Sequence, residues 1–258
     1  MAFSRAETCE VELAAGKEAP MTEDELLKRA ADLPPGRVGQ LQIADRSYFV
    51  KTVETHQKLR LHITKGDPVK ALAREVELLR AFAARGAPVA RLVAANATHM
   101  VLADHGKPVE KLIRHGQVDD ALLRQIGAAL ADLHSRDLAH GRPMLRDICY
   151  DGASITFLDL EAGASLNATD RDKARDVLIL IYSIMVTTNA NQHMARMVIE
   201  GYRNAGTDSV WRATRRRSRG LWWLQLLAMP GVWAHRKRGK TRSEMAAVAA
   251  TRALIAAI

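Results

Sequence analysis

The spacing of apolar residues predicts a small sheet near the N-terminus and helices over most of the remaining chain. Thr22 begins the segment TEDELLKRAADL with Glu25 three residues on, the pattern of a capped amphipathic helix that ends before Pro34. From Gly36 to Val53, apolar and polar residues alternate around an Ala-Asp-Arg-Ser turn, which predicts two antiparallel strands. Lys51 lies on the second strand.

Longer apolar patterns come after this sheet. Residues 68–85 and 120–135 carry apolar side chains at helical spacing, and residues 172–186 form a strongly apolar segment that we expect to be a buried helix. Short runs at 89–93 and 99–104 predict strands that close the sheet, and the HGKP sequence after them is typical of a linker. Beyond the second long helix, the pattern predicts a loop and then two short strands joined by an Asp-Gly turn.

The composition fits a folded intracellular protein. The chain has 258 residues, of which 48% are hydrophobic, enough for one sizeable core or two small lobes. Cys9 and Cys149 lie far apart without the spacing of a metal site, so we expect ordinary buried thiols in a reducing cytoplasm. The N-terminus does not have the pattern of a secretory signal, and the longest apolar run, Val177 to Val186, is too short to span a bilayer.

Residues able to carry chemistry succeed one another in a particular order. Lys51 on a strand precedes Glu75 on a helix, and a buried ammonium needs such a carboxylate to stay charged and aimed. Asp147 and Asp159 then flank the second pair of strands, so that hairpin can bring two carboxylates to one hard cation such as Mg²⁺.

This order resembles the protein-kinase-like superfamily over roughly residues 36–200. Within it, the short loops resemble the bacterial lipopolysaccharide-core (Kdo/heptose) kinases and the RIO-like small kinases. The resemblance implies an α+β, two-lobed fold with a small antiparallel-sheet N-lobe and a mainly helical C-lobe. It also implies an N-terminal extension with a short helix at 1–35, an N-lobe at 36–104, and a C-lobe at 105–258 that ends in a basic, Trp-rich helical part.

The same resemblance implies a binding site for ATP and Mg²⁺. Lys51 matches the strand lysine that grips the α- and β-phosphates, and Glu75 matches its helix partner. The resemblance therefore implies that Lys51 and Glu75 pair in a cleft that faces Asp159. The sequence GRVG, from Gly36 to Gly39, stands where the family has a longer glycine-rich loop that cradles phosphate.

The His-Gly loop (residues 140–147) matches the family's catalytic loop with one departure. His140 and Gly141 match directly, while Arg142 replaces the aspartate that accepts the acceptor's proton. Asp147 falls where the family has a metal-binding asparagine and can serve as metal ligand or as substitute base. Asp159 falls at the Mg²⁺-chelating aspartate. Base catalysis contributes about 10² to 10⁴-fold, so the exchange does not exclude activity.

Ordinary interpretations of these residues stay open. A strand lysine usually faces solvent, a helix glutamate usually lies on the surface, and Asp147 and Asp159 could simply be turn residues. His140 is better suited to hold its loop than to act as acid or base, and Asp176 resembles the family aspartate that braces that loop through its backbone. The functional interpretation therefore rests on the order and spacing of these residues along the chain taken together.

Two functions are implied by the resemblance. The first is an ATP-dependent phosphotransferase that acts on a sugar or glycolipid hydroxyl such as lipopolysaccharide core, with Asp147, Arg142 and His140 in the catalytic loop. Arg142 would face the acceptor and could bind its phosphate or carboxylate. The second is a pseudokinase that binds nucleotide or a partner without phosphoryl transfer.

Net charge is +9, and much of the excess lies in two basic blocks around a Trp-rich stretch. The set that suits an anionic membrane surface at the inner face of the cell membrane is Arg215–Arg219, Trp222, Trp223 and Arg236–Lys240. Alternatively, the tryptophans complete the C-lobe core and the charges are solvated. Nucleic acid is not an expected partner, because no recognition helix or RNA motif accompanies the basic blocks.

Overall fold

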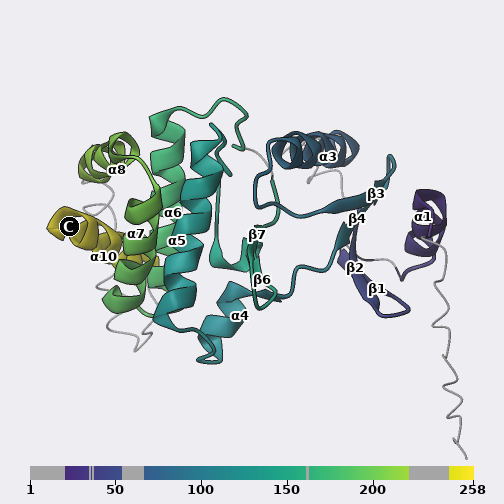
Figure 1. Cartoon of the computed structure of the whole chain (residues 1–258), viewed down its shortest axis with the longest axis horizontal. Coiled ribbons are helices and arrows are strands. Elements are labelled where there is room, and N and C mark those ends of the chain that lie inside the picture. The colour runs from purple at the N-terminus through teal and green to yellow at the C-terminus, as the bar shows by residue number, and fades with distance from the viewer. Residues whose placement is uncertain (1–20, 35, 37, 54–66, 161–162, 221–243) are drawn as a thin grey trace, which may run out of the picture.

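The computed structural model describes residues 21–34, 36, 38–53, 67–160, 163–220 and 244–258. The chain has a two-lobed α+β fold, in which an antiparallel sheet precedes a mainly helical region (Figure 1). The N-terminal elements are α1 (Glu23–Ala31), β1 (Val38–Ile43), β2 (Arg46–Thr52), α3 (Pro68–Ala84), β3 (Leu92–Ala95) and β4 (His99–Ala103). The later elements are β5 (Lys107–Pro108), α4 (Val109–Arg114), α5 (Asp120–Ser135), the 3₁₀ turn η1 (Leu145–Asp147), β6 (Ile148–Tyr150), β7 (Ile155–Phe157), α6 (Asp170–Thr187), α7 (Gln192–Ala205), α8 (Asp208–Gly220) and α10 (Glu244–Ala257).

The N-terminal sheet has two differently covered faces. Its strands run in the order β1-β2-β4-β3, all antiparallel. Val50 on β2 and its partner Val101 on β4 pack with Leu26 of α1 in a small apolar cluster. Successive strand residues point to opposite faces, so Lys51 and its partner Met100 lie on the other face, where Met100 joins the larger core that includes α3. The alternation of the strand thus aims Lys51 at α3.

The helix predictions are confirmed almost to the residue. The Thr22 side chain accepts a hydrogen bond from the backbone of Glu25 and caps α1, and Asp67 caps α3 in the same way. The helix α5 covers the predicted residues 120–135, and the apolar segment at 172–186 lies within α6. The helix α1, predicted as an extension, covers one face of the sheet (Figure 1). The lobe boundaries at residues 35 and 104 stay predictions.

Two short segments, residues 89–93 and the HGKP sequence, differ from the sequence prediction. The strand β3 begins at Leu92, and Val89 forms only an isolated bridge to Phe157 of β7. The HGKP sequence is more than a linker, since Lys107 and Pro108 pair with β6, and Pro108 is the N-cap residue of α4. The Val89 bridge and the Lys107–Pro108 pairing are too short to leave a periodic pattern in the sequence.

The helical region is packed most closely where α5 crosses α7. A methyl group added at Gly127 of α5 would collide with the backbone of Val198, and one at Gly201 of α7 would collide with the backbone of Arg124. Close approach of two helix backbones therefore requires glycine at both positions. Beside this pair, α6 contributes buried apolar side chains to the core along most of its length.

The described residues test the expected lack of a membrane-spanning helix and the burial of Cys149. None of the helices within the described ranges is long and apolar enough to cross a membrane. Cys149 is a free, buried thiol, and burial raises its pKa to about 12. Cys9 lies outside the described residues, as do Trp222, Trp223 and Arg236–Lys240.

Candidate active site

Lys51 lies at the centre of the polar groups between the sheet and the helical region. Its Nζ is 2.5 Å from Oε2 of Glu75 and 2.7 Å from Oδ1 of Asp159. The three residues come from β2, α3 and the segment after β7, which are far apart in sequence. The expectation that Lys51 and Glu75 pair while facing Asp159 is confirmed.

Local structure explains how each carboxylate reaches the lysine. Glu75 lies on the buried side of α3 beside Leu72, Val76 and Leu79, and only 5% of it is exposed. Asp159 has a φ of 64°, in the left-handed region that aspartate tolerates better than most residues. Such a turn ends the extended chain after β7 and lets the carboxylate face the sheet.

The charges around Lys51 keep it protonated. Burial by itself lowers the pKa of the Lys51 ammonium, but the negative charges of Glu75 and Asp159 outweigh it. The pKa is therefore raised above its usual value. Lys51 is a firmly held cation, able to meet an anionic ligand.

A buried aspartate braces the His-Gly loop from below. Asp176 of α6, which is fully buried, accepts hydrogen bonds from the backbone N–H of His140 at 2.6 Å and of Gly141 at 2.9 Å. Gly141 has a φ of 93°, and a side chain there would collide with the backbone at Gly163. The structural role predicted for Asp176 is confirmed.

His140 ties the loop to the segment that carries Asp159. Its Nε2 lies 2.7 Å from the carbonyl of Leu158, so Nε2 carries the proton, and Nδ1 accepts from the backbone N–H of Arg142 at 3.3 Å. Burial lowers the pKa of His140, which keeps the ring neutral. Both ring nitrogens are engaged, which agrees with a scaffold role.

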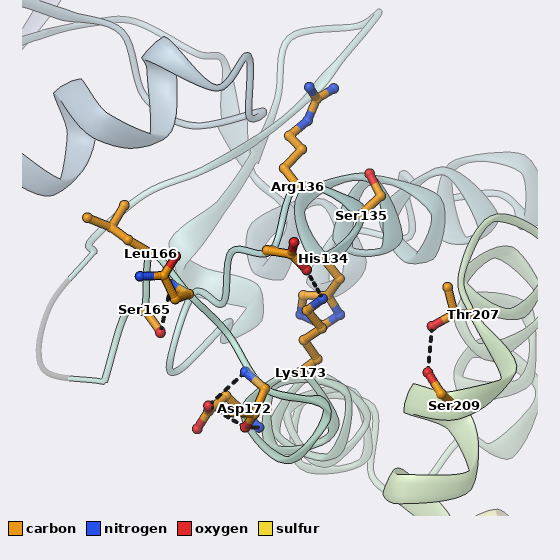
Figure 2. A network of polar contacts seen from close by, with 12 residues as sticks. His134, Ser135, Arg136, Ser165, Leu166, Asp172, Lys173, Thr207 and Ser209 are labelled. Carbon is orange, nitrogen blue, oxygen red and sulfur yellow. Dashed lines mark hydrogen bonds and ion pairs between the residues drawn. The ribbon is translucent and has the colours of Figure 1, made fainter.

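Further supports of the loop were missed by sequence analysis. Nε2 of His134 on α5 lies 3.4 Å from the Asp176 carboxylate, and its Nδ1 lies 2.8 Å from the hydroxyl of Tyr202 on α7. Ser183 of α6 accepts a hydrogen bond from the backbone of Leu145. Figure 2 shows Lys173 of α6 extending toward the end of α5, where its ammonium bonds Asp137 at 2.8 Å. A polar residue within an otherwise apolar helix, such as Ser183, is the signal that could have found them.

Two arginines of the His-Gly loop lie beside the acidic groups. Nη2 of Arg142 is 3.8 Å from Oδ2 of Asp159, and Nε of Arg146 is 3.5 Å from Oδ1 of Asp147. Both arginine side chains are about half exposed, at 47% and 55%, whereas only 11% of the Asp147 side chain is exposed. Arg146 was not predicted as a site residue, although its position directly before Asp147 was a usable signal.

The two aspartates fit a Mg²⁺-nucleotide better than a metal held by protein alone. No group of three or more His, Cys, Asp or Glu side chains within the described ranges could hold a metal ion. Proteins commonly hold Mg²⁺ through only one or two carboxylates together with substrate phosphates and water. The Leu158 N–H donates to the Asp147 carbonyl at 2.8 Å, which joins the segments that carry Asp147 and Asp159. The donor set fits Mg²⁺ that arrives with a nucleotide.

The two predicted phosphate-loop glycines lie away from the hairpin turn. Gly39 is inside β1, opposite Val50, and Gly36 precedes the strand. A methyl group at Gly39 would meet Leu33 at 2.9 Å, so this glycine allows the chain after α1 to pack against β1. The β1–β2 turn consists of Ala44 and Asp45, with Ala44 at a φ of 47°. The structure thus does not bring Gly36 and Gly39 to the turn that would cover a phosphate.

An antiparallel sheet that presents a partly buried lysine–glutamate pair to a mainly helical region is the architecture of protein-kinase-like phosphotransferases. Comparison of the sequence with protein families places the chain within this class. It belongs to the APH family, the phosphotransferase enzyme family, whose profile matches residues 40–236. Neither the lipopolysaccharide-core branch nor the RIO-like branch is singled out by the similar proteins.

Two similar proteins match only parts of the chain. An uncharacterized protein of Haemophilus influenzae is 28% identical over 152 residues, which cover 57% of this chain and 62% of that protein. A "probable bifunctional tRNA threonylcarbamoyladenosine biosynthesis protein" of Methanobrevibacter smithii is 31% identical over 109 residues, which cover 42% of this chain and 19% of that protein. The matched segments thus cover less than two thirds of either relative.

Proposed function

We propose that the chain is an ATP- and Mg²⁺-dependent phosphotransferase that phosphorylates a hydroxyl of a sugar or glycolipid, such as lipopolysaccharide core. Membership in a phosphotransferase family supports the general reaction. The observation that carries the proposal is the position of Lys51 between Glu75 and Asp159, at 2.5 and 2.7 Å. A fixed cation beside a carboxylate suits the phosphates and the metal of a nucleotide.

The proposed role of each group follows from the ligand that it can bind in place of its present partner. Lys51 would bind the α- and β-phosphates, and Glu75 would keep its ammonium charged and aimed. Asp159 would release Lys51 and, with Asp147, hold Mg²⁺, which neutralises charge on the transferred phosphoryl group. Asp159 is 25% exposed, so a ligand can reach it without unfolding the site.

The proton of the acceptor hydroxyl needs a receiving group. His140 does not suit this role, because Leu158 and the Arg142 backbone engage both of its ring nitrogens. Asp147 is the remaining carboxylate on the His-Gly loop, and we assign it as metal ligand or proton acceptor. Phosphoryl transfer depends mainly on positioning and charge, so a weak base is compatible with turnover.

The direct test begins with thermal melting of the full chain in the presence of ATP, with and without Mg²⁺. Transfer of ³²P from γ-labelled ATP to extracted lipopolysaccharide and to sugar and glycolipid fractions then tests the reaction. We expect a Mg²⁺-dependent rise in melting temperature and a labelled product. Absence of any nucleotide-dependent shift would contradict the proposal at its first step.

The second candidate function is a pseudokinase, which Arg142 favours because it stands beside Asp159 where the family has its proton acceptor. A Mg²⁺-dependent thermal shift without labelled product in any fraction would support this alternative. We do not extend the tRNA-related activity in the name of the Methanobrevibacter smithii relative to this chain, because the match covers 19% of that protein. We propose action at the cytoplasmic face of the cell membrane, with contact to anionic lipid as an additional feature.

A further inference from the structure

Arg142 and Arg146 stand four residues apart on the His-Gly loop, each beside one of the two aspartates. Their contacts, at 3.8 and 3.5 Å, are long for charged partners. Within the part of the chain that the structure describes, neither guanidinium donates a side-chain hydrogen bond. Arg136 provides a contrast, because it donates to both carboxylate oxygens of Asp132, one of them at 2.8 Å. The two loop arginines therefore retain donors for a ligand.

The position of these donors restricts what they can bind. Lys51 lies on the sheet side of Asp159, where the nucleotide phosphates are proposed to bind, whereas Arg142 and Arg146 belong to the loop that would face the acceptor. A guanidinium presents a planar fork that matches phosphate and carboxylate. Two half-exposed forks on one loop attract an anionic acceptor and repel a polycationic one.

We infer that the acceptor is an anionic hydroxyl compound, with a phosphate or carboxylate close to the hydroxyl that is phosphorylated. Arg142 and Arg146 bind this anionic group and determine acceptor specificity. The exchange of an aspartate for Arg142 then replaces a proton-accepting group with an anion receptor. This inference rests on the proposed phosphotransferase function.

The first experiment sorts acceptors by charge. Small molecules and glycolipids extracted from cells that encode the chain are separated into anion-exchange-retained and unretained fractions. Each fraction is incubated with the full chain, Mg²⁺ and γ-labelled ATP. We expect labelled product from the retained fraction, and dephosphorylation or carboxyl reduction of that fraction before the assay identifies which anion is required.

The outcomes separate this inference from the function on which it rests. Label that appears only with unretained acceptors overturns the anionic acceptor and leaves the phosphotransferase intact. Label with neither fraction overturns the phosphotransferase itself and the inference with it. Label with retained acceptors that persists after both anion-removing treatments also overturns the inference.

The second experiment assigns the effect to the two arginines. Arg142→Gln and Arg146→Gln should each raise the KM for the retained acceptor about ten- to a hundredfold, the loss expected for a hydrogen bond to a charged group. The KM for ATP should not change, and Arg142→Lys and Arg146→Lys should recover part of the loss. Arg124→Gln, which removes an exposed contact between α5 and Glu200 of α7, is the matched control and should change neither KM. A rise in the KM for ATP alone would show that the arginines bind nucleotide, and would overturn the inference.

Discussion

Asp159 and Asp176, the carboxylates on the two sides of the His-Gly loop, are held in opposite ways. Asp176 is fully buried and accepts from two backbone N–H groups, which cannot leave without moving the chain. Asp159 is 25% exposed and contacts the flexible side chains of Lys51 and Arg142. The contrast indicates that Asp176 fixes the frame of the site, whereas Asp159 can change partners when a ligand binds.

The largest expected effect comes from removing the fixed carboxylate. Asp176→Ala leaves two buried backbone donors and the His134 ring without their acceptor. A buried donor left without a partner typically costs about 1 to 3 kcal/mol, so the free energy of unfolding should fall by several kcal/mol in urea denaturation.

Asp132→Asn is the control for Asp176→Ala. The Asp132 carboxylate is 46% exposed and pairs with Arg136, the residue that caps the end of α5, so its loss should cost less than about 1 kcal/mol. Equal destabilisation by Asp176→Ala and Asp132→Asn would contradict the structural role of Asp176.

The exchangeable carboxylate should show the reverse behaviour. Asp159→Asn keeps the size of the side chain and a residue type that tolerates a positive φ, so the apo protein should melt close to wild type. The Mg²⁺-dependent stabilisation by ATP should vanish. In the wild type this stabilisation would reach about 2.7 kcal/mol at a ligand concentration of a hundred times Kd. Thermal melting measures both quantities, and an unchanged ATP-Mg²⁺ shift would remove Asp159 from the site.

The same contrast explains how much of the site the sequence could predict. Lys51, Glu75 and Asp159 are recognisable because their order along the chain is distinctive, and the alternation of β2 already aims Lys51 away from Val50. The support from Tyr202 and Ser183 depends on how α6 and α7 pack against the loop. Such contacts arise from tertiary packing. A polar residue within an apolar helix, such as Ser183, marks a candidate, but the sequence does not show which loop residue it contacts.

The fold was predictable to a similar extent. The helices α3 and α5 have long apolar faces and capping residues, so their bounds can be predicted from the sequence. Gly36 and Gly39 illustrate the opposite case, because a glycine can serve a tight turn or a close contact, and Gly39 makes its close contact with Leu33. A short glycine-containing motif therefore does not define a phosphate loop without its position relative to the strands.

The pH dependence of stability should report on the buried frame. Burial lowers the pKa of both His134 and His140, so the folded state keeps both rings neutral, while in the unfolded chain they titrate near pH 6.5. Their contribution to stability is complete above pH 6.5 and is lost as pH falls below it, toward the lowered pKa values. Each histidine should contribute a slope of up to about 1.4 kcal/mol per pH unit.

Urea denaturation of wild type and His134→Asn between pH 5 and pH 8 measures this slope. The variant should be less stable at pH 8, because the contacts with Tyr202 and Asp176 are altered, but its stability should fall less steeply on acidification. The same slope in both proteins would mean that His134 does not titrate on unfolding and would remove it from the acid-sensitive frame.

The smallest expected effect concerns two exposed arginines of α8. They extend the comparison from the two held carboxylates of the site to exposed charges on the surface. Arg216 and Arg219 are exposed, and no ion pair of either occurs among the residues that the structure describes. Each basic residue near an anionic membrane contributes about 1 kcal/mol of attraction, which salt screens. Wild-type chain should therefore sediment with anionic liposomes at low salt and be released as salt rises. Arg216→Gln and Arg219→Gln should each weaken binding about fivefold, whereas Arg124→Gln on α5 should not.

Trp222 and Trp223 lie outside the described residues, and their fluorescence on liposome addition separates adsorption from insertion. A blue shift indicates that the rings enter the interface. Sedimentation that is insensitive to both salt and the α8 changes would contradict an electrostatic membrane contact through these arginines.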